Sequence, residues 1–176
     1  MRMVRVLGVV FAFVGFAGMA NGLMAADMDG DDETKPWAEV EVPLPPPPKE
    51  QDLIGFYVSA ATDNKFFVDP ASISVGSDGV VRYTLVVLSA AGVRNVSFEG
   101  MRCETRERRL YAFGRSDGSW SKSRNDRWEK VREAASNRQH ASLFQEYFCP
   151  GGVIVRTADE ARDALRRGIH PSSVRW

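Results

Sequence analysis

Two cysteines and two histidines are the residues of this 176-residue chain best suited to chemistry. Cys103 and Cys149 lack a Cys-x-x-Cys spacing, which disfavours a redox pair and favours one disulfide. With His140 and His170 they cannot supply a zinc site, which takes three or four free ligands. His140 falls on an apolar helical stripe, so we expect it to pack in the core with its ring nitrogen bonded to backbone.

Two further patterns resemble sites but are incomplete. Ser119-x-x-Lys122 has the Ser-x-x-Lys spacing of exported acyl-transfer enzymes, yet the companion motifs of those enzymes are missing from the sequence. Asp27-x-Asp-x-Asp begins like a calcium loop, but its twelfth position is Ala38 instead of glutamate. We therefore expect no catalytic residue, no cofactor and no metal ligand.

Residues 1–22 have the order of a secretory signal peptide. Arg2 and Arg5 precede the apolar run Val6–Gly18, and Ala20-Asn21-Gly22 offers a small-residue exit before Leu23. The run is shorter than the roughly 20 residues that span a bilayer, and no cysteine follows for lipid attachment. We expect a periplasmic protein that is neither a lipoprotein nor membrane-spanning after cleavage. That oxidising compartment strengthens the disulfide prediction.

Residues 23–52 have the composition of a tether. Residues 27–52 hold two lysines and nine acids, so 2 − 9 = −7, and the proline run 43–48 follows the acidic stretch. Such a segment buries too little apolar surface to order itself, and prolines favour an extended polyproline helix. We expect it to be mostly disordered, with Trp37, Val40 and Val42 able to dock part of it on the globular domain 53–176.

The domain 53–176 begins with strand signals. Val80–Ala90 is apolar on both faces, which predicts a central strand covered on both sides. In the next strand, expected at Val93–Thr105, the apolar phase slips at Glu99-Gly100, which predicts a bulge. A strand starting at Phe66 is expected to stop at Asp69-Pro70. Further strands are expected at Leu53–Ser59, Val93–Thr105 and Arg109–Arg115.

Helix signals come at the end of the chain. His140, Leu143, Phe144 and Tyr147 have offsets of 0, 3, 4 and 7, which place them on one helical face. Thr157-Ala-Asp-Glu is a capping box that begins a second helix. Strands followed by helices indicate an α+β domain: an antiparallel meander sheet followed by two C-terminal helices, with one disulfide.

Aromatic and basic residues form a candidate contact surface. Tryptophan, tyrosine and arginine dominate binding hot spots, so such a sheet face suits an envelope protein or a glycan. The alternative is a half-buried core with charges at its rim. Nucleic acid is not expected as a partner in this compartment. The candidate residues are Arg106, Arg108, Arg109, Tyr111, Arg115, Trp120 and Trp128.

Residues 52–150 contain an ordered set of short motifs: Phe67–Ile73, Gly76–Thr84, Glu99–Cys103, Leu110–Ala112, Gly118–Trp120, Trp128 and Tyr147–Pro150. In these motifs the chain resembles the CNP-one-like family of exported bacterial proteins. The resemblance implies export in a Gram-negative bacterium, and it implies no activity, cofactor or catalytic residue. We therefore expect a non-enzymatic binding or envelope-interaction module. The alternative is a periplasmic hydrolase or redox enzyme that uses His140 or another polar site.

Overall fold

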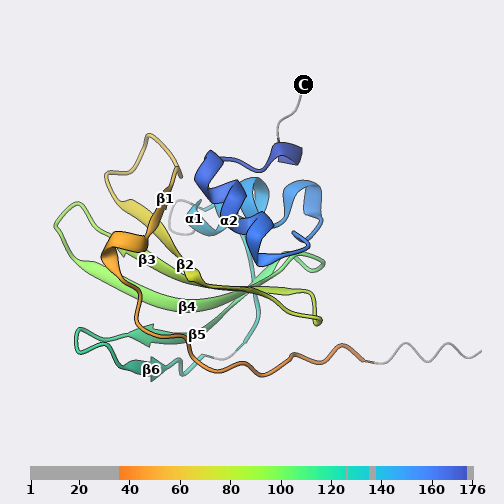
Figure 1. Cartoon of the computed structure of the whole chain (residues 1–176), viewed down its shortest axis with the longest axis horizontal. Coiled ribbons are helices and arrows are strands. Elements are labelled where there is room, and N and C mark those ends of the chain that lie inside the picture. Colours follow the sequence, from red (N-terminus) through yellow and green to blue (C-terminus); the bar gives the residue numbers. More distant parts are fainter. Residues whose placement is uncertain (1–35, 126, 135–137, 174–176) are drawn as a thin grey trace, which may run out of the picture. The chain divides into compact units, whose positions relative to one another are not determined.

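An antiparallel meander sheet with helices on one face is the architecture of the chain (Figure 1). The computed structural model describes residues 36–125, 127–134 and 138–173, so the predicted signal peptide lies outside the described residues. Strands β1 to β6 neighbour one another in sequence order, and β7 pairs with β5. Their bounds are β1 Ile54–Phe56, β2 Lys65–Val75, β3 Val80–Leu88, β4 Arg94–Arg102, β5 Glu107–Gly114, β6 Trp120–Lys122 and β7 Glu129–Lys130.

Helices follow the sheet, which confirms the predicted α+β class. Helix α1 (Arg138–Ser142) continues into a π-helical segment, η3 (Leu143–Phe148), and α2 (Ala158–Arg167) comes after it. Thr157 Oγ1 accepts a hydrogen bond from Glu160 N, as the capping box predicts. Within the described part of the chain, no helix is long and apolar enough to cross a membrane.

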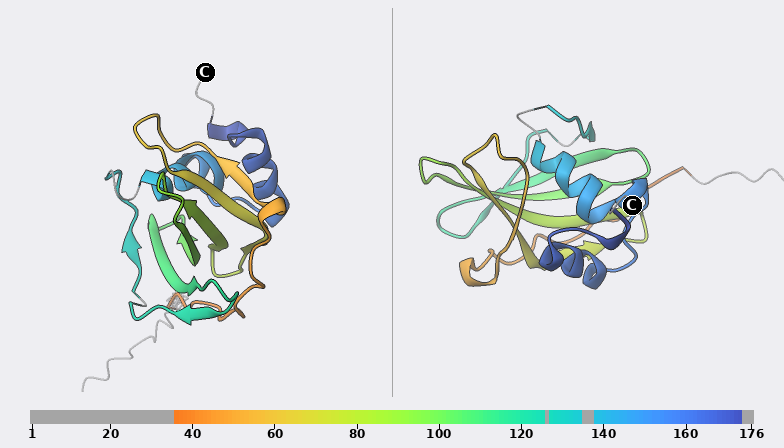
Figure 2. Two further views of the ribbon diagram at one scale, coloured as in Figure 1. Left: turned by 90° about the vertical axis from the view of Figure 1, so that its left-hand side faces the viewer. Right: turned by 90° about the horizontal axis from the view of Figure 1, so that it is seen from above.

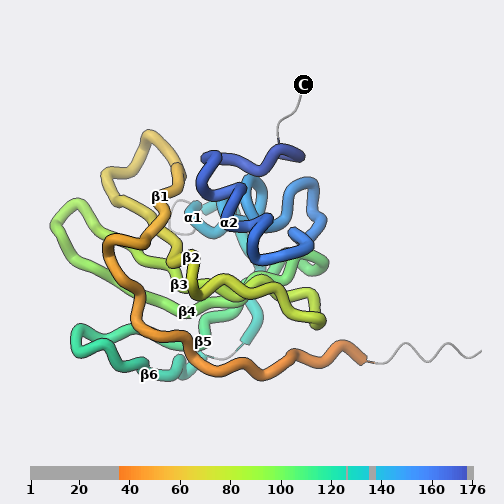
Figure 3. Tube along the Cα trace, viewed as in Figure 1, coloured from red at the N-terminus to blue at the C-terminus, as the bar shows by residue number. Residues whose placement is uncertain are grey.

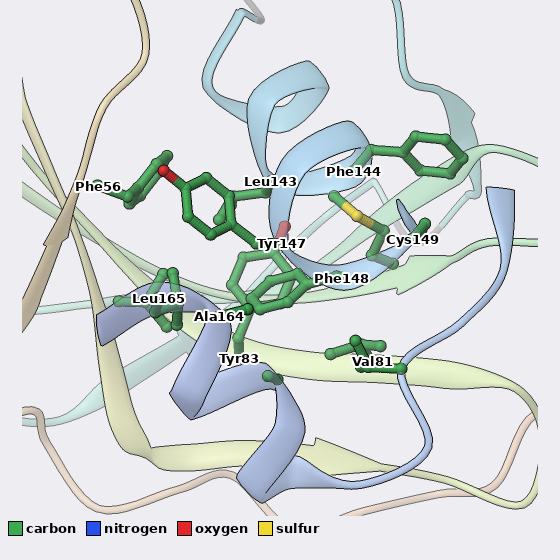
Figure 4. Packing of buried hydrophobic residues seen from close by; sticks show 14 of the residues in the cluster. Phe56, Val81, Tyr83, Leu143, Phe144, Tyr147, Phe148, Cys149, Ala164 and Leu165 are labelled. Atoms are coloured by element: carbon green, nitrogen blue, oxygen red, sulfur yellow. The ribbon is translucent and has the colours of Figure 1, made fainter. Parts of the chain in front are cut away.

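Strand β3 is covered on both faces, as its apolar pattern predicted. Every residue from Val80 to Val86 is buried. One face carries Tyr83, whose ring centre lies 5.0 Å from that of Phe148 in the helical layer (Figure 4). The other face carries Arg82, a charged side chain that is fully buried. A buried arginine must have partners, so this second face also has a specific cover.

A bulge does lie beside Glu99 and Gly100 of β4, but the extra residue belongs to β5, the strand that pairs with β4. Phe98 pairs with Ala112 and Glu99 pairs with Leu110, so the extra residue is Tyr111 of β5. Strand β4 keeps a continuous register with β3. Its apparent slip arises because both of its faces are buried, and each face contributes apolar residues to the pattern.

Strand β2 runs through the place where the sequence predicted its end. Its register with β3 shifts between Asp69 and Ser74, so the proline is accommodated in an irregular stretch. The carboxylate of Asp69 accepts a hydrogen bond from Ala71 N, and Arg162 Nε of α2 donates to the carbonyl of Pro70 at 2.8 Å. Helix α2 is therefore tied to the irregular part of the sheet.

The disulfide prediction is confirmed. Cys103 and Cys149 are bonded, both are buried, and their Cα atoms lie 5.5 Å apart. Cys103 follows β4 and Cys149 follows η3, so the bond joins the sheet to the helical layer (Figure 4).

Candidate functional site

Residues 36–48, which we call the arm, lie extended along the sheet on the side away from the helices (Figure 1, Figure 2). Glu39, Val42, Pro45 and Pro48 are half-buried, and the residues between them are exposed. This repeat of three is the periodicity of a polyproline II helix. One edge of the arm therefore faces the sheet, and two edges face solvent.

The arm corrects the boundary expected at residue 53. The compact unit begins at Pro36, and the chain runs from the arm through a turn at Glu50–Asp52 directly into β1 (Figure 3). The composition of residues 23–52 predicted a mostly disordered tether, with Trp37, Val40 and Val42 able to dock part of it, because composition counts only what a segment can bury by itself. The sheet supplies the partners, so residues 36–52 belong to the folded domain.

Glu39 is the anchor of the arm. Its carboxylate forms an ion pair with Arg109 Nη1 and accepts hydrogen bonds from Tyr111 Oη at 2.5 Å and from Trp128 Nε1 at 3.2 Å. Arg82 Nη2 lies 3.5 Å from the same carboxylate. Hydrogen bonds to a charged group are about twice as strong as neutral ones, so this one side chain carries much of the attachment.

The main chain of the arm next to Glu39 also forms specific hydrogen bonds. Val40 N donates to Asp78 Oδ2 at 2.8 Å, and the Val40 carbonyl accepts from Arg82 Nη2 at 2.7 Å. Arg82 Nη2 also bonds Asp78 Oδ2 at 2.6 Å. Trp37 Nε1 donates to the carbonyl of Asp78, and the guanidinium of Arg102 lies 4.1 Å above the Trp37 ring. The buried Arg82 is thus paired within the chain.

Two glycines make room for these side chains. A Cβ at Gly100 would lie 2.3 Å from Tyr111 Oη, so only glycine lets the bulged Tyr111 cross β4 towards Glu39. A Cβ at Gly76 would lie 2.2 Å from Asp78 Oδ1 and 2.7 Å from Arg82 Nη1. The contacts around Glu39 therefore depend on the absence of a Cβ atom at Gly100 and Gly76.

The proline part of the arm lies against β6. Trp120 Nε1 donates to the carbonyl of Pro45 at 2.8 Å, and Pro47 packs on the turn at Gly118. A cavity of about 430 Å³ separates the arm from the sheet, and Leu44, Phe98 and Lys122 are among its lining residues. We call the surface that receives the arm the groove. Its residues are Arg82, Phe98, Arg109, Tyr111, Trp120 and Trp128.

Comparison with known proteins gives one match. The model of the CNP1-like family matches residues 32–166, about three quarters of the chain, including both the arm and the groove. The chain belongs to the CNP1-like family. Neither the curated proteins nor the solved structures contain a match to it.

The structure of this CNP1-like protein brings together four of the seven candidate contact residues, and they hold the arm: Arg109, Tyr111, Trp120 and Trp128. The other three lie apart from the groove contacts. Arg106 pairs with Glu133 and Arg108 pairs with Glu129, while the Arg115 guanidinium donates to Ser121 Oγ.

Sequence reasoning missed three members of the site: Glu39, Asp78 and Arg82. A signal for Arg82 was present, because it is the one charged residue in a largely apolar central strand. Within the described ranges, no three histidine, cysteine or carboxylate side chains gather as a metal site requires.

Tyr111, Asp78 and Arg82 are held in their ordinary charge states. Burial, and then the hydrogen bond to Glu39, raise the pKa of Tyr111. Burial by itself raises the pKa of Asp78, but hydrogen bonds from Arg82 and Val40 outweigh it and the pKa is lowered. Burial opposes the charge of Arg82, yet its bond to Asp78 raises the pKa overall. These shifts move the pKa values further from neutral pH, so the three groups suit binding better than proton transfer.

Substituting Glu39 tests the anchor. Glu39→Gln removes the charge from three or four polar contacts, each worth about 1.5–3 kcal/mol when charged. We expect the Val40 amide hydrogen to exchange ten- to a hundredfold faster in this CNP1-like variant, measured by NMR. The exposed Glu41→Gln is the matched control, and it should leave the exchange rate unchanged. Equal rates in the wild-type chain and Glu39→Gln would show that Glu39 does not hold the arm.

A second polar cluster is buried between the sheet and α1. His140 Nε2 lies 2.8 Å from Glu99 Oε2, Tyr83 Oη donates to the same oxygen at 3.1 Å, and Ser97 Oγ donates to Glu99 Oε1 at 2.7 Å. His140 is packed as predicted, but its partner is this carboxylate and not backbone. His140 and Glu99 are 4% and 3% exposed, so solvent does not reach the pair.

The buried carboxylate predicts a loss of stability in acid. Burial raises the pKa of Glu99, but His140 and the hydrogen bonds outweigh it, so the pKa falls from 4.5 to about 2. The stabilisation is complete above pH 4.5 and is lost as the pH falls through 2. It amounts to about 3 kcal/mol, from 1.36 kcal/mol per pKa unit.

Urea unfolding at a series of pH values between 2 and 6 measures this loss. A Glu99→Met/His140→Leu variant, which removes the carboxylate together with its ring partner, should show a flatter dependence in the same window. A wild-type curve that is no steeper than that of the double variant would contradict the assignment.

Proposed function

We propose that this protein is an exported, periplasmic binding module without enzymatic activity, and that it contacts a component of the cell envelope through the groove. The observation that carries the proposal is the docking of Glu39. The groove holds a peptide segment with arginine, tyrosine and tryptophan side chains, the residue types that dominate protein hot spots. A surface that binds a segment of its own chain in this way has the chemistry to bind another.

The state of the polar groups supports binding over catalysis. A general acid or base works best with a pKa near the working pH. The shifts of Tyr111, Asp78 and Arg82 lead away from that range. His140, on which a hydrolase or redox mechanism would depend, is buried against Glu99 and does not line the 430 Å³ cavity.

Two features support export. The order of charged, apolar and small residues in positions 1–22 is that of a signal peptide. The Cys103–Cys149 disulfide suits an oxidising compartment, since such bonds are rare in reducing ones.

Photo-crosslinking in the native bacterium tests the proposal. A photoreactive amino acid replaces either Lys122, an exposed residue at the cavity, or Arg166, an exposed residue of α2. We expect a discrete adduct with an envelope component from position 122 and none from position 166. Adding Arg109→Gln should remove the adduct. Adducts of equal yield from both positions, or an adduct that survives Arg109→Gln, would contradict the proposal.

A further inference from the structure

We infer that the ligand of the groove is an acidic, proline-rich segment of another polypeptide, and that the arm is its built-in competitor. This inference rests on the proposed function, because it names the partner class for the same surface. It goes further in stating what the partner must look like and why the groove is occupied in the isolated chain.

The contacts define the chemistry that the groove recognises. The groove binds a carboxylate between Arg109 and Tyr111, which is the role of Glu39. It also binds an indole two positions earlier in the segment, which is the role of Trp37. It takes a carbonyl six positions after the carboxylate, where Trp120 Nε1 donates to Pro45. These requirements describe a short linear segment and not a folded surface.

The groove also selects the backbone shape. Burial of the arm at every third residue shows that one edge of a polyproline-type helix fits between the aromatic side chains. Aromatic-lined grooves commonly bind proline-rich peptides in this conformation, because it is preformed and loses little entropy on binding. The proline run of the arm and the tryptophan of β6 form such a pair within one chain.

The arm is built to be displaceable. In the described chain, the core between the sheet and the helices contains no arm residue, so that core stays intact when the arm leaves. The outer edges of the docked arm remain exposed, with Trp37, Val40 and Leu44 each at least 38% accessible. Release of the arm uncovers Phe98 and separates Arg82 from Glu39. An empty groove is therefore less stable than one in which a similar segment replaces the arm.

Competition within the chain sets the condition for binding. A linked segment acts at an effective concentration in the millimolar range. An external ligand sees only the fraction of molecules whose arm is released, so its apparent affinity falls by that fraction. Weakening the arm without changing the groove must therefore strengthen binding of an external segment.

The test uses a fluorescent synthetic peptide with the sequence of residues 36–48, titrated into the full mature chain and followed by anisotropy. We expect the variants Glu39→Gln and Trp37→Ala/Glu39→Gln to bind the peptide at least tenfold more tightly than the wild-type chain. The Glu41→Gln variant should behave like the wild-type chain. A peptide with glutamine in place of its first glutamate should bind the weakened chains at least tenfold less tightly. Amide spectra of β3 verify that each variant is folded.

Three results would overturn the inference. The first is that a folded, arm-weakened chain does not bind the peptide. The second is that the wild-type chain binds it as tightly as the weakened variants, so that the arm does not compete. The third is a wild-type chain that sediments as a dimer and becomes monomeric with the peptide, which makes the occupant a second copy. Peptide binding without a crosslink from position 122 would refute the proposed function and leave the chemistry of the groove established.

Discussion

Replacing His140 by leucine is expected to lower the free energy of unfolding by about 3–5 kcal/mol, the usual cost of leaving one charge of a buried pair without its partner. Glu99 is 3% exposed and would keep its two hydroxyl donors, Tyr83 and Ser97, but lose the ring nitrogen at 2.8 Å. This exceeds the cost of a lost neutral hydrogen bond, which is about 1 kcal/mol.

A double-mutant cycle in urea measures the effect. Glu99→Met/His140→Leu should be more stable than His140→Leu, because replacing both partners by apolar residues removes the unpaired charge. His170→Leu is the matched control, since its partner Glu160 is more exposed and the pair is weaker. A stable His140→Leu variant that had lost an enzymatic activity would instead favour the hydrolase or redox alternative.

Removing the disulfide is expected to lower the free energy of unfolding by about 4 kcal/mol. The bond closes a loop between residues 46 positions apart, and the chain-entropy relation gives this value for that length. Cys103→Ala/Cys149→Ala and the reduced wild-type chain should unfold at the same urea concentration, below that of the oxidised chain. If reduction leaves the midpoint unchanged, the bond does not contribute to stability.

The elements that sequence reasoning predicted well carry a local signal. Strand β3 is apolar at adjacent positions, which only a strand buried on both faces tolerates. The stripe of Leu143, Phe144 and Tyr147 faces the core as its spacing requires. The cysteine pair had one reasonable interpretation once export was assumed.

The groove could not be predicted from the sequence, because its residues are far apart in the chain and one bulge decides which of them share a face of the sheet. The extra residue Tyr111 changes which side chains of β5 share a face, so the arginines of that strand do not act as one set. Glu99 also gave no sign of its partner, because strand alternation does not reveal which helix will lie above a given residue. Composition predicted a tether because the partners of residues 36–48 come after residue 75.

The contacts of Glu39 impose an order on folding. Its partner Trp128 lies 89 positions later in the chain. Ribosomes add about 5–20 residues per second, so roughly 4–18 s pass between synthesis of the two residues. Each newly made chain therefore has its arm before it has a complete groove. Every molecule therefore passes once through a stage in which this segment has been made but has no complete groove to occupy.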